Sequence, residues 1–301
     1  MGSPRKNLSI SLNFPVFDFP MAETGYRRCR DLIEATKRGD IVCVVRLLKE
    51  GRNPNVRDEN GKTPLHYAVL EGPTMVKFLL EHGADPDVAD NDGVTPLHVA
   101  SMFGLYDVVK LLLSRRRRLN VNVQDEGGKT PLHEAATRCS PDVARLLLMS
   151  GANPNVRDNT GHTPLHSAVL LRPCVDVVKI LLEVGADPNA RTKHGRTPLH
   201  TAALHGNPEL IRLLLKHGAN PNVQDDRGAT PLHEAVKRKK VDAVKVLLQH
   251  GADSAIRDSE GKTPIDYAKE AGRNDILKIL TEKTTAGRTS ARRRGRKAAP
   301  A

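Results

Sequence analysis

Aromatic side chains are scarce in this chain. Aromatic residues make up 3% of the 301 residues, and tryptophan is absent. This composition argues against a large aromatic core or an aromatic-lined cofactor pocket. No run of ~20 uninterrupted apolar residues occurs either, so we expect no membrane-spanning segment. The only apolar stretch near the start is broken by Pro15, Asp18 and Pro20, which argues against a signal peptide.

Cysteine is also rare, and the four cysteines are far apart. Cys29, Cys43, Cys139 and Cys174 form no Cys-x-x-Cys pair. Their spacing therefore favours neither a zinc site nor a disulfide framework. We expect them to serve as small buried apolar side chains, which fits a reducing compartment.

Positive charge is in excess, and it is unevenly distributed. The formal net charge is +12, and residues 284–301 hold six basic residues and no acidic ones. This segment has the composition of a disordered basic tail. Such tails bind nucleic acid by neutralising phosphates, although no aromatic residues are interspersed here for base stacking. In a eukaryotic cell the same run could direct nuclear import.

A tetrapeptide recurs through most of the chain at a nearly constant interval. Thr-Pro-Leu-His begins at six threonines, and Thr-Pro-Ile-Asp begins at Thr263. Successive starts are 32, 35, 33, 34, 33 and 33 residues apart, which indicates one structural unit with small loop changes. The six threonines are Thr63, Thr95, Thr130, Thr163, Thr197 and Thr230.

Each part of the unit has a physical reason. Gly61 stands where a tight hairpin tip needs positive φ. Thr63 can cap a first helix, and Pro64 fits its first turn because the missing N–H has no helical partner there. Gly83 ends a second helix in the left-handed conformation. Apolar residues at helical spacing give each helix a buried stripe; in this unit they are Leu65, Ala68, Val69, Val76, Leu79 and Leu80.

The repeated pattern DxxGxTPLHxAxxxGxxxVVKxLLxxGADPN resembles the ankyrin repeat, and the resemblance covers about Cys29 to Leu280. It implies an all-α repeat solenoid of helix-turn-helix units with β-hairpin loops. We expect about eight units, including an N-terminal and a C-terminal cap, in an array ~80 Å long. The predicted organisation is a non-repeat extension at 1–28, an ankyrin-repeat domain at 29–281 and a basic disordered tail at 282–301.

The sequence contains no complete motif for catalysis or for binding a cofactor. Gly-Lys-Thr occurs at three hairpins, but the glycine that a phosphate-binding loop needs five residues earlier is missing. Six histidines recur once per repeat, yet stacked helices lie ~8–10 Å apart, too far for neighbouring histidines to share a metal ion. The resemblance implies that they form hydrogen bonds within and between repeats. We therefore predict that the protein is not an enzyme and that it binds neither a cofactor nor a metal ion. These histidines are His66, His98, His133, His166, His200 and His233.

The resemblance places a partner on the concave surface formed by hairpin tips and first helices. The residues just before each inter-helix turn point away from the core, and four or five exposed apolar ones in line would be an unusual patch. Single exposed apolar residues are ordinary, however, and charged hairpins also keep repeat arrays soluble. The predicted contact residues are Leu70, Met102, Phe103, Arg138, Leu171, Arg196, Leu204, His205, Arg227, Lys237 and Arg238.

The predicted function is that of a scaffold or adaptor that binds another protein. If the basic residues of the concave surface are functional, the partner presents an acidic surface toward the C-terminal half of the array. The alternative is a nucleic-acid-associated protein that uses the basic tail. We expect a cytoplasmic monomer, or a nuclear one if the host is eukaryotic. Two features stay open: the Arg115–Arg118 run is either a solvated loop change or an anion contact, and Met21 is either the true start or part of a docking segment.

Overall fold

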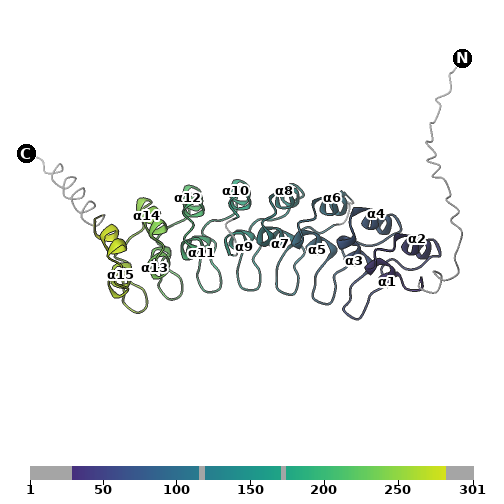
Figure 1. The fold of residues 1–301 in the computed structure, drawn as a ribbon, viewed down its shortest axis with the longest axis horizontal. Coiled ribbons are helices and arrows are strands. Elements are labelled where there is room, and N and C mark those ends of the chain that lie inside the picture. The colour runs from purple at the N-terminus through teal and green to yellow at the C-terminus, as the bar shows by residue number, and fades with distance from the viewer. Residues whose placement is uncertain (1–28, 115–118, 171–173, 283–301) are drawn as a thin grey trace, which may run out of the picture.

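The chain folds into a curved array of short helices in two rows (Figure 1). The computed structural model describes residues 29–114, 119–170 and 174–282. Odd-numbered helices form an inner row, even-numbered helices form an outer row, and hairpin loops extend from the inner row on the concave side. The eighth pair is completed by helical residues 274–282, so the described residues form eight helix pairs.

The helices are six to nine residues long. Their bounds are α1 Leu32–Lys37, α2 Ile41–Lys49, α3 Pro64–Glu71, α4 Pro73–Glu81, α5 Pro96–Met102, α6 Tyr106–Ser114, α7 Pro131–Arg138, α8 Pro141–Met149, α9 Pro164–Leu170, α10 Val175–Glu183, α11 Pro198–His205, α12 Pro208–Lys216, α13 Pro231–Lys237, α14 Val241–Gln249 and α15 Pro264–Glu270.

Each inner helix starts as the tetrapeptide predicts. Thr63 is extended at φ −91° and ψ 165°, and Pro64 follows as the first helical residue. The Thr63 N–H donates to Nδ1 of His66 at 3.0 Å, so the histidine of the tetrapeptide caps its own helix. In the last repeat Asp266 replaces the histidine, and its Oδ2 accepts from the Thr263 N–H at 2.9 Å.

The hairpins are tight loops, and no strand occurs among the described residues. At the first tip the Asp58 N–H donates to the Lys62 carbonyl at 3.0 Å, and Gly61 has a φ of 76°. One backbone bond ties each tip to the next; the first joins the Asn91 N–H to the Asn60 carbonyl at 2.9 Å. These bonds set the register of the stack along its concave edge.

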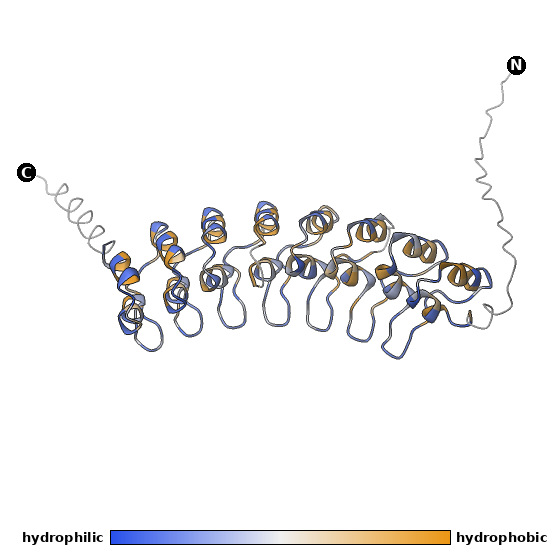
Figure 2. Ribbon diagram, in the orientation of Figure 1, coloured by the Kyte–Doolittle hydropathy of each residue, from blue (hydrophilic) through white to orange (hydrophobic). Residues whose placement is uncertain are grey.

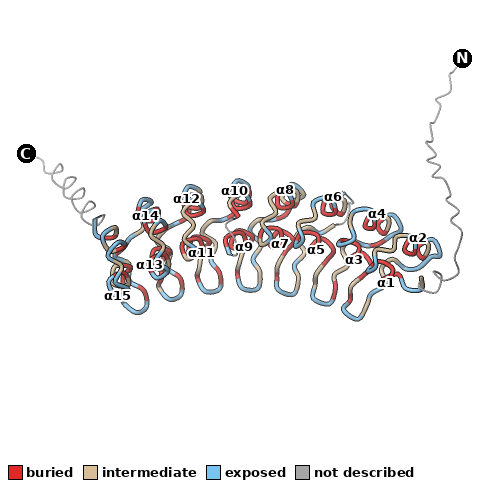
Figure 3. Tube along the Cα trace, viewed as in Figure 1, coloured by how far each residue is buried: buried red, intermediate tan, exposed pale blue. Residues whose placement is uncertain are grey.

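The core lies between the two rows of helices. The leucine of each Thr-Pro-Leu-His is at most 1% exposed, and the outer helices contribute buried valines and leucines (Figures 2 and 3). Burial of each such side chain stabilises the array by about 1.5–3 kcal/mol before entropy is subtracted. The buried tetrapeptide leucines are Leu65, Leu97, Leu132, Leu165, Leu199 and Leu232.

An asparagine in the segment after most outer helices bridges neighbouring repeats. The Asn155 side chain donates to the Gly185 carbonyl at 3.0 Å and accepts from the Asp187 N–H at 2.8 Å. Asn55, Asn189 and Asn222 make the same pair of bonds. The conformation of one connecting segment is therefore fixed by the repeat that follows.

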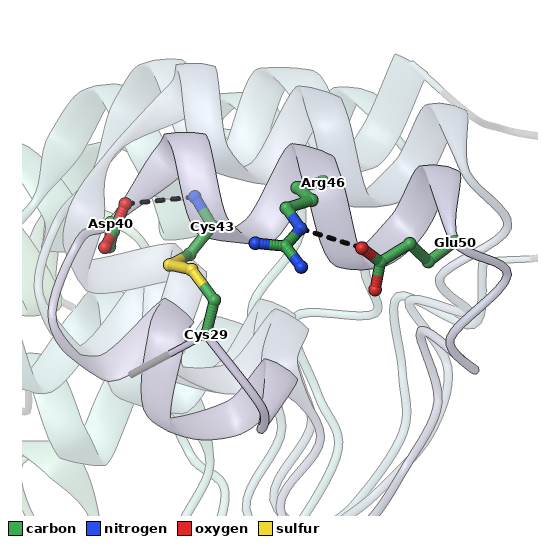
Figure 4. The surroundings of a disulfide bond; sticks show 5 residues. All are labelled: Cys29, Asp40, Cys43, Arg46 and Glu50. Carbon is green, nitrogen blue, oxygen red and sulfur yellow. Dashed lines mark hydrogen bonds and ion pairs between the residues drawn. A yellow bond between two sulfur atoms is a disulfide. The ribbon is translucent and has the colours of Figure 1, made fainter. Parts of the chain in front are cut away.

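The prediction of four unpaired cysteines is wrong. Cys29 and Cys43 form a disulfide with Cα atoms 5.5 Å apart, and Cys139 and Cys174 form another with Cα atoms 5.3 Å apart. The first lies within the N-terminal repeat (Figure 4), and the second joins consecutive repeats. Sequence spacing did not reveal either pair, because cysteines 14 residues apart meet through the packing of two helices in one repeat and cysteines 35 residues apart meet through the stacking of two repeats.

Four predictions concern residues outside those that the structure describes. They are the N-terminal extension at 1–28, the Arg115–Arg118 run, the contact residue Leu171, and the basic tail beyond Glu282.

Candidate functional site

Most of the predicted contact residues lie where the inner helices end, as the position before each turn requires, whereas Arg196 and Arg227 lie in the hairpins. Leu70 is 53% exposed near the end of α3, and Met102 and Phe103 are 40% and 46% exposed at the end of α5. Because α3 packs against α5, these three side chains occupy neighbouring repeats. The core therefore does not bury them, and they form an exposed apolar group that we call the apolar zone.

The other apolar candidates are separated from this group. Leu170, the neighbour of Leu171, is 42% exposed at the end of α9, and Arg138 is exposed at the end of α7, which lies between α5 and α9. Leu204 is half-buried and His205 is exposed at the end of α11. Beyond the apolar zone, the contact row thus carries both polar and apolar side chains.

A cleft of about 520 Å³ lies between the hairpins and ends of α11 and α13. We call it the ionic cleft. Five predicted contact residues line it, so the structure brings together positions that are far apart in sequence. Sequence reasoning missed the other polar residues of its wall, His194, Asp225, Asp226 and Glu234. The five predicted residues are Arg196, Leu204, Arg227, Lys237 and Arg238.

Two of the basic residues in the ionic cleft already have acidic partners. Nη1 of Arg196 lies 2.9 Å from Oε1 of Glu234 and 3.7 Å from Oδ2 of Asp225. Among the described residues, Arg227 and Arg238 have no such ion pair. The cleft is therefore a mixed ionic surface with two guanidinium groups available to a ligand, rather than a uniformly basic patch.

Lys237 is held in a cluster at the edge of the same cleft. Its Nζ lies 3.3 Å from Oδ2 of Asp258 and 4.1 Å from the centre of the Tyr267 ring. Burial works to lower the pKa of Lys237, but the hydrogen bonds with Tyr267 and Asp258 outweigh it and raise that pKa above its usual value. Lys237 therefore links the seventh repeat to the eighth, and its charge is largely compensated.

The hairpin arginines mainly join one hairpin to the next. Arg157 donates through Nη2 to the Arg191 carbonyl at 2.5 Å, and Arg191 donates to the Gln224 carbonyl at 2.9 Å. Arg257 donates to the Gly261 carbonyl within its own hairpin. These arginines therefore have a structural role within the array, in addition to the solubility that charged hairpins provide.

The six histidines of the Thr-Pro-Leu-His tetrapeptides, which we call the histidine ladder, form the hydrogen bonds that the family resemblance implies. Nε2 of His66 lies 3.0 Å from the Val94 carbonyl of the next hairpin, while its Nδ1 accepts from Thr63. The other five histidines make the corresponding contacts at 3.0–3.2 Å. Since both ring nitrogens are bonded to the protein, the ladder offers no atom to a metal ion.

One group in the described part of the chain has metal-ligand spacing, namely Cys29, Asp40 and Cys43. Its two sulfur atoms are bonded to each other, and Asp40 accepts a hydrogen bond from the Cys43 N–H at 3.0 Å as the cap of α2 (Figure 4). In this state the group has no thiolate to offer a cation. No helix in the described ranges is long and apolar enough to cross a membrane.

Comparison with known proteins agrees with the architecture. A family profile for ankyrin repeats in three copies matches residues 32–125, 116–192, 159–225 and 199–289. A Pyrobaculum aerophilum protein whose name assigns it to the ankyrin repeats is 46% identical over 39 residues. That match spans 13% of this chain and 15% of the relative, so it bears on the repeat unit rather than on the whole protein. Since the profile matches cover nearly all of the eight helix pairs, this chain belongs to the ankyrin-repeat family.

Proposed function

We propose that this protein is a scaffold or adaptor that binds another protein along the concave surface of its repeats. Ankyrin repeats generally mediate protein–protein interaction, and proteins built from them are typically not enzymes. The observation that carries the proposal is the apolar zone. Leu70, Met102 and Phe103 expose 53%, 40% and 46% of their surface at the ends of two neighbouring inner helices, where they contribute little to the core.

The ionic cleft supports a partner with two kinds of contact. An apolar segment would cover Leu70, Met102 and Phe103, and acidic side chains would reach Arg227 and Arg238. Arg196 and Lys237 contribute less to binding, because their ion pairs with Glu234 and Asp258 would have to be broken first. A contact of standard size buries roughly 800 Å² on each partner, which the concave face of eight repeats can accommodate.

The experiment is a pull-down from the native cell with full-length protein as bait, followed by affinity measurement for the protein recovered. We expect Met102→Ala/Phe103→Ala to weaken binding by about 2 kcal/mol or more. Arg227→Ala/Arg238→Ala should weaken it by about 1 kcal/mol or more, and more strongly at low salt than at high salt.

The matched control replaces exposed apolar side chains of the outer row. Val42 and Val184 are 76% and 49% exposed, so Val42→Ala/Val184→Ala removes a smaller amount of exposed apolar surface away from the concave face. Binding that is equally affected by this control, or unaffected by both concave double variants, would refute the assignment of the surface.

A second candidate is nucleic-acid association through the basic tail, favoured by six basic residues and no acidic ones in 284–301. Salt titration of DNA and RNA binding separates the two candidates, using the full chain and a chain truncated after Glu282. Tight, salt-sensitive binding that truncation abolishes would favour the tail. The cytoplasmic or nuclear location and the monomeric state remain predictions, and the disulfides remove the cysteine argument for a reducing compartment.

A further inference from the structure

One residue of the turn between the two helices of a repeat adopts the left-handed conformation. Glycine holds this place in several repeats, including Gly104 at φ 67° and Gly206 at φ 77°. In the fourth repeat the residue is Cys139, at φ 64°. A side chain other than glycine is disfavoured in this conformation. A cysteine here therefore carries a conformational cost that glycine would not.

The surroundings of the turn show what a side chain at this place would contact. A Cβ atom added to Gly104 would lie 2.7 Å from Oγ of Ser140, and one added to Gly206 would lie 2.5 Å from Cδ of Lys240. Ser140 and Lys240 are the residues that cap the outer helix of the following repeat, α8 and α14. In these two repeats the turn therefore faces the cap of the next outer helix.

Cys139 and Cys174 occupy this pair of positions in the fourth and fifth repeats. Cys174 caps α10, and its Cα lies 5.3 Å from that of Cys139, within the range for a disulfide. The bond is thus a product of the stacking geometry, and it joins two units that otherwise meet through packing and hydrogen bonds such as that of His133 with the His162 carbonyl.

We propose that the Cys139–Cys174 bond is a reversible thiol–disulfide site that fixes the fourth repeat to the fifth. Cys174 is 3% exposed, whereas Cys139 is partly exposed in its turn. A small thiolate such as that of glutathione attacks Sγ of Cys139, and Cys174 leaves as a thiolate that takes a proton. A second thiol then attacks the mixed disulfide, which releases Cys139 as a thiol and the small molecule as its disulfide. The reverse reaction, with glutathione disulfide as oxidant, restores the bond.

Because of its position, the Cys139–Cys174 bond affects the cooperativity of the whole array. In a stack where each unit contacts only its neighbours, cooperativity depends on every interface, and the weakest interface decides where the stack separates. This bond lies between the fourth and fifth of eight units. Opening it weakens the junction that holds the two halves together, next to Arg138 in the predicted contact row.

The other disulfide supplies a matched control. Cys29 and Cys43 both belong to the first repeat, at one end of the array, where opening the bond affects no junction between units. Cys29→Ser/Cys43→Ser leaves the central bond alone, and Cys139→Gly/Cys174→Ser leaves the terminal bond alone. Glycine is the suitable replacement at 139 because it occupies this turn position elsewhere without strain.

The test uses the full chain equilibrated in glutathione buffers of graded ratio, with free thiols blocked before peptide mapping by mass spectrometry. Amide hydrogen exchange is measured on the same samples. In Cys29→Ser/Cys43→Ser, we expect the 139–174 cross-link to appear and disappear with the buffer ratio. Its loss should speed the slowest exchange in α7 and α10 by on the order of 100-fold, with smaller effects toward both ends.

Three results would overturn the proposal. The two thiols could both remain alkylatable in excess glutathione disulfide, or the cross-link could resist excess reduced glutathione. Alternatively, exchange in α7 and α10 could be the same in the two states. In Cys139→Gly/Cys174→Ser, amide exchange in α7 and α10 should already be fast and should not depend on the buffer ratio. If exchange in this variant did depend on the ratio, the effect would belong to the Cys29–Cys43 bond instead. No step of this test requires the binding partner, so its outcome is independent of the proposed function.

Discussion

Acidification between pH 7 and pH 5 should destabilise the array through its histidine ladder. His200 is fully buried; its Nδ1 accepts from the Thr197 N–H at 3.0 Å, and its Nε2 lies 3.0 Å from the Ala229 carbonyl of the next repeat. This pair of bonds requires the neutral ring, because a protonated Nδ1 cannot accept. Burial is the main cause that lowers the pKa of His166 and His200 from 6.5 to about 4.

The direction follows from which state binds the proton. Above pH 6.5 both states hold neutral histidine, and the full stability of the ladder is present. As the pH falls below 6.5, these histidines bind protons in the unfolded chain but not yet in the folded chain. The folded state is therefore destabilised progressively until the pH falls below the folded-state pKa of about 4. At pH 5 the difference amounts to roughly 2 kcal/mol for each of these two histidines, or about 4 kcal/mol together.

Carboxylates do not account for a loss in this window. Burial opposes the ionised form of Asp158 and Asp258, but hydrogen bonds to each carboxylate outweigh it and lower both pKa values below 3.8. Their stabilising effect is therefore present above about pH 4 and disappears only in stronger acid. The other ladder histidines also have lowered pKa values, mainly from burial, and add to the loss.

The assay is urea denaturation followed by circular dichroism at pH 7, 6 and 5, at constant ionic strength. The matched variant is His200→Asn, because an asparagine oxygen can still accept from Thr197, as Asp266 does from Thr263 in the last repeat. We expect the variant to be about 1–3 kcal/mol less stable at pH 7, since the Ala229 carbonyl loses its donor. Its loss between pH 7 and pH 5 should be smaller than that of the natural protein by about 2 kcal/mol. Equal slopes for the two proteins, or no loss in either, would refute the role assigned to the ladder.

Three further substitutions test the packing by urea denaturation. Lys239→Gly should stabilise the protein by about 0.5–1 kcal/mol, because Lys239 has a φ of 59° in the turn position that glycine holds elsewhere; no gain would contradict the strain argument. Leu181→Ala should cost about 2–5 kcal/mol because Leu181 is fully buried, while Val184→Ala, at a site 49% exposed, should change stability by less than ~0.5 kcal/mol. Asn155→Ala should cost about 1 kcal/mol through its two bonds to the next repeat, and an unchanged midpoint would show that water replaces them.

Much of the fold could be predicted because the period is visible in the sequence. Thr63 and Pro64 predict the start of an inner helix, and α3 begins at Pro64. The apolar stripe predicted for the outer helix, Val76, Leu79 and Leu80, is buried in α4. Eight units with two caps are confirmed by the helix pairs. These features are local, and each is specified within one repeat.

The features that could not be predicted from the sequence depend on contacts between repeats. The ion pair of Arg196 with Glu234 joins residues 38 apart, and a count of basic residues therefore overestimated the positive charge of the cleft. The Cys139–Cys174 pair was missed for the same reason. A signal was nevertheless present, since Cys139 stands in the turn where other repeats carry glycine, and Cys174 follows 35 residues later, about one repeat along. Comparing equivalent positions in successive repeats would have suggested the pairing.

The same comparison identifies the surface on which selection for a partner could act. In the hairpins, Arg157 and Arg191 are engaged with the next hairpin, and in the inner helices His133 and its equivalents join successive repeats. A substitution at any of these positions would disturb the junction between two units before it altered recognition. Met102 and Arg238, at the ends of inner helices, carry no such bond among the described residues and can change without that penalty. The structural positions recur in every repeat, whereas the helix-end positions differ from repeat to repeat. This variation along the concave row supports the proposal that the row binds the partner.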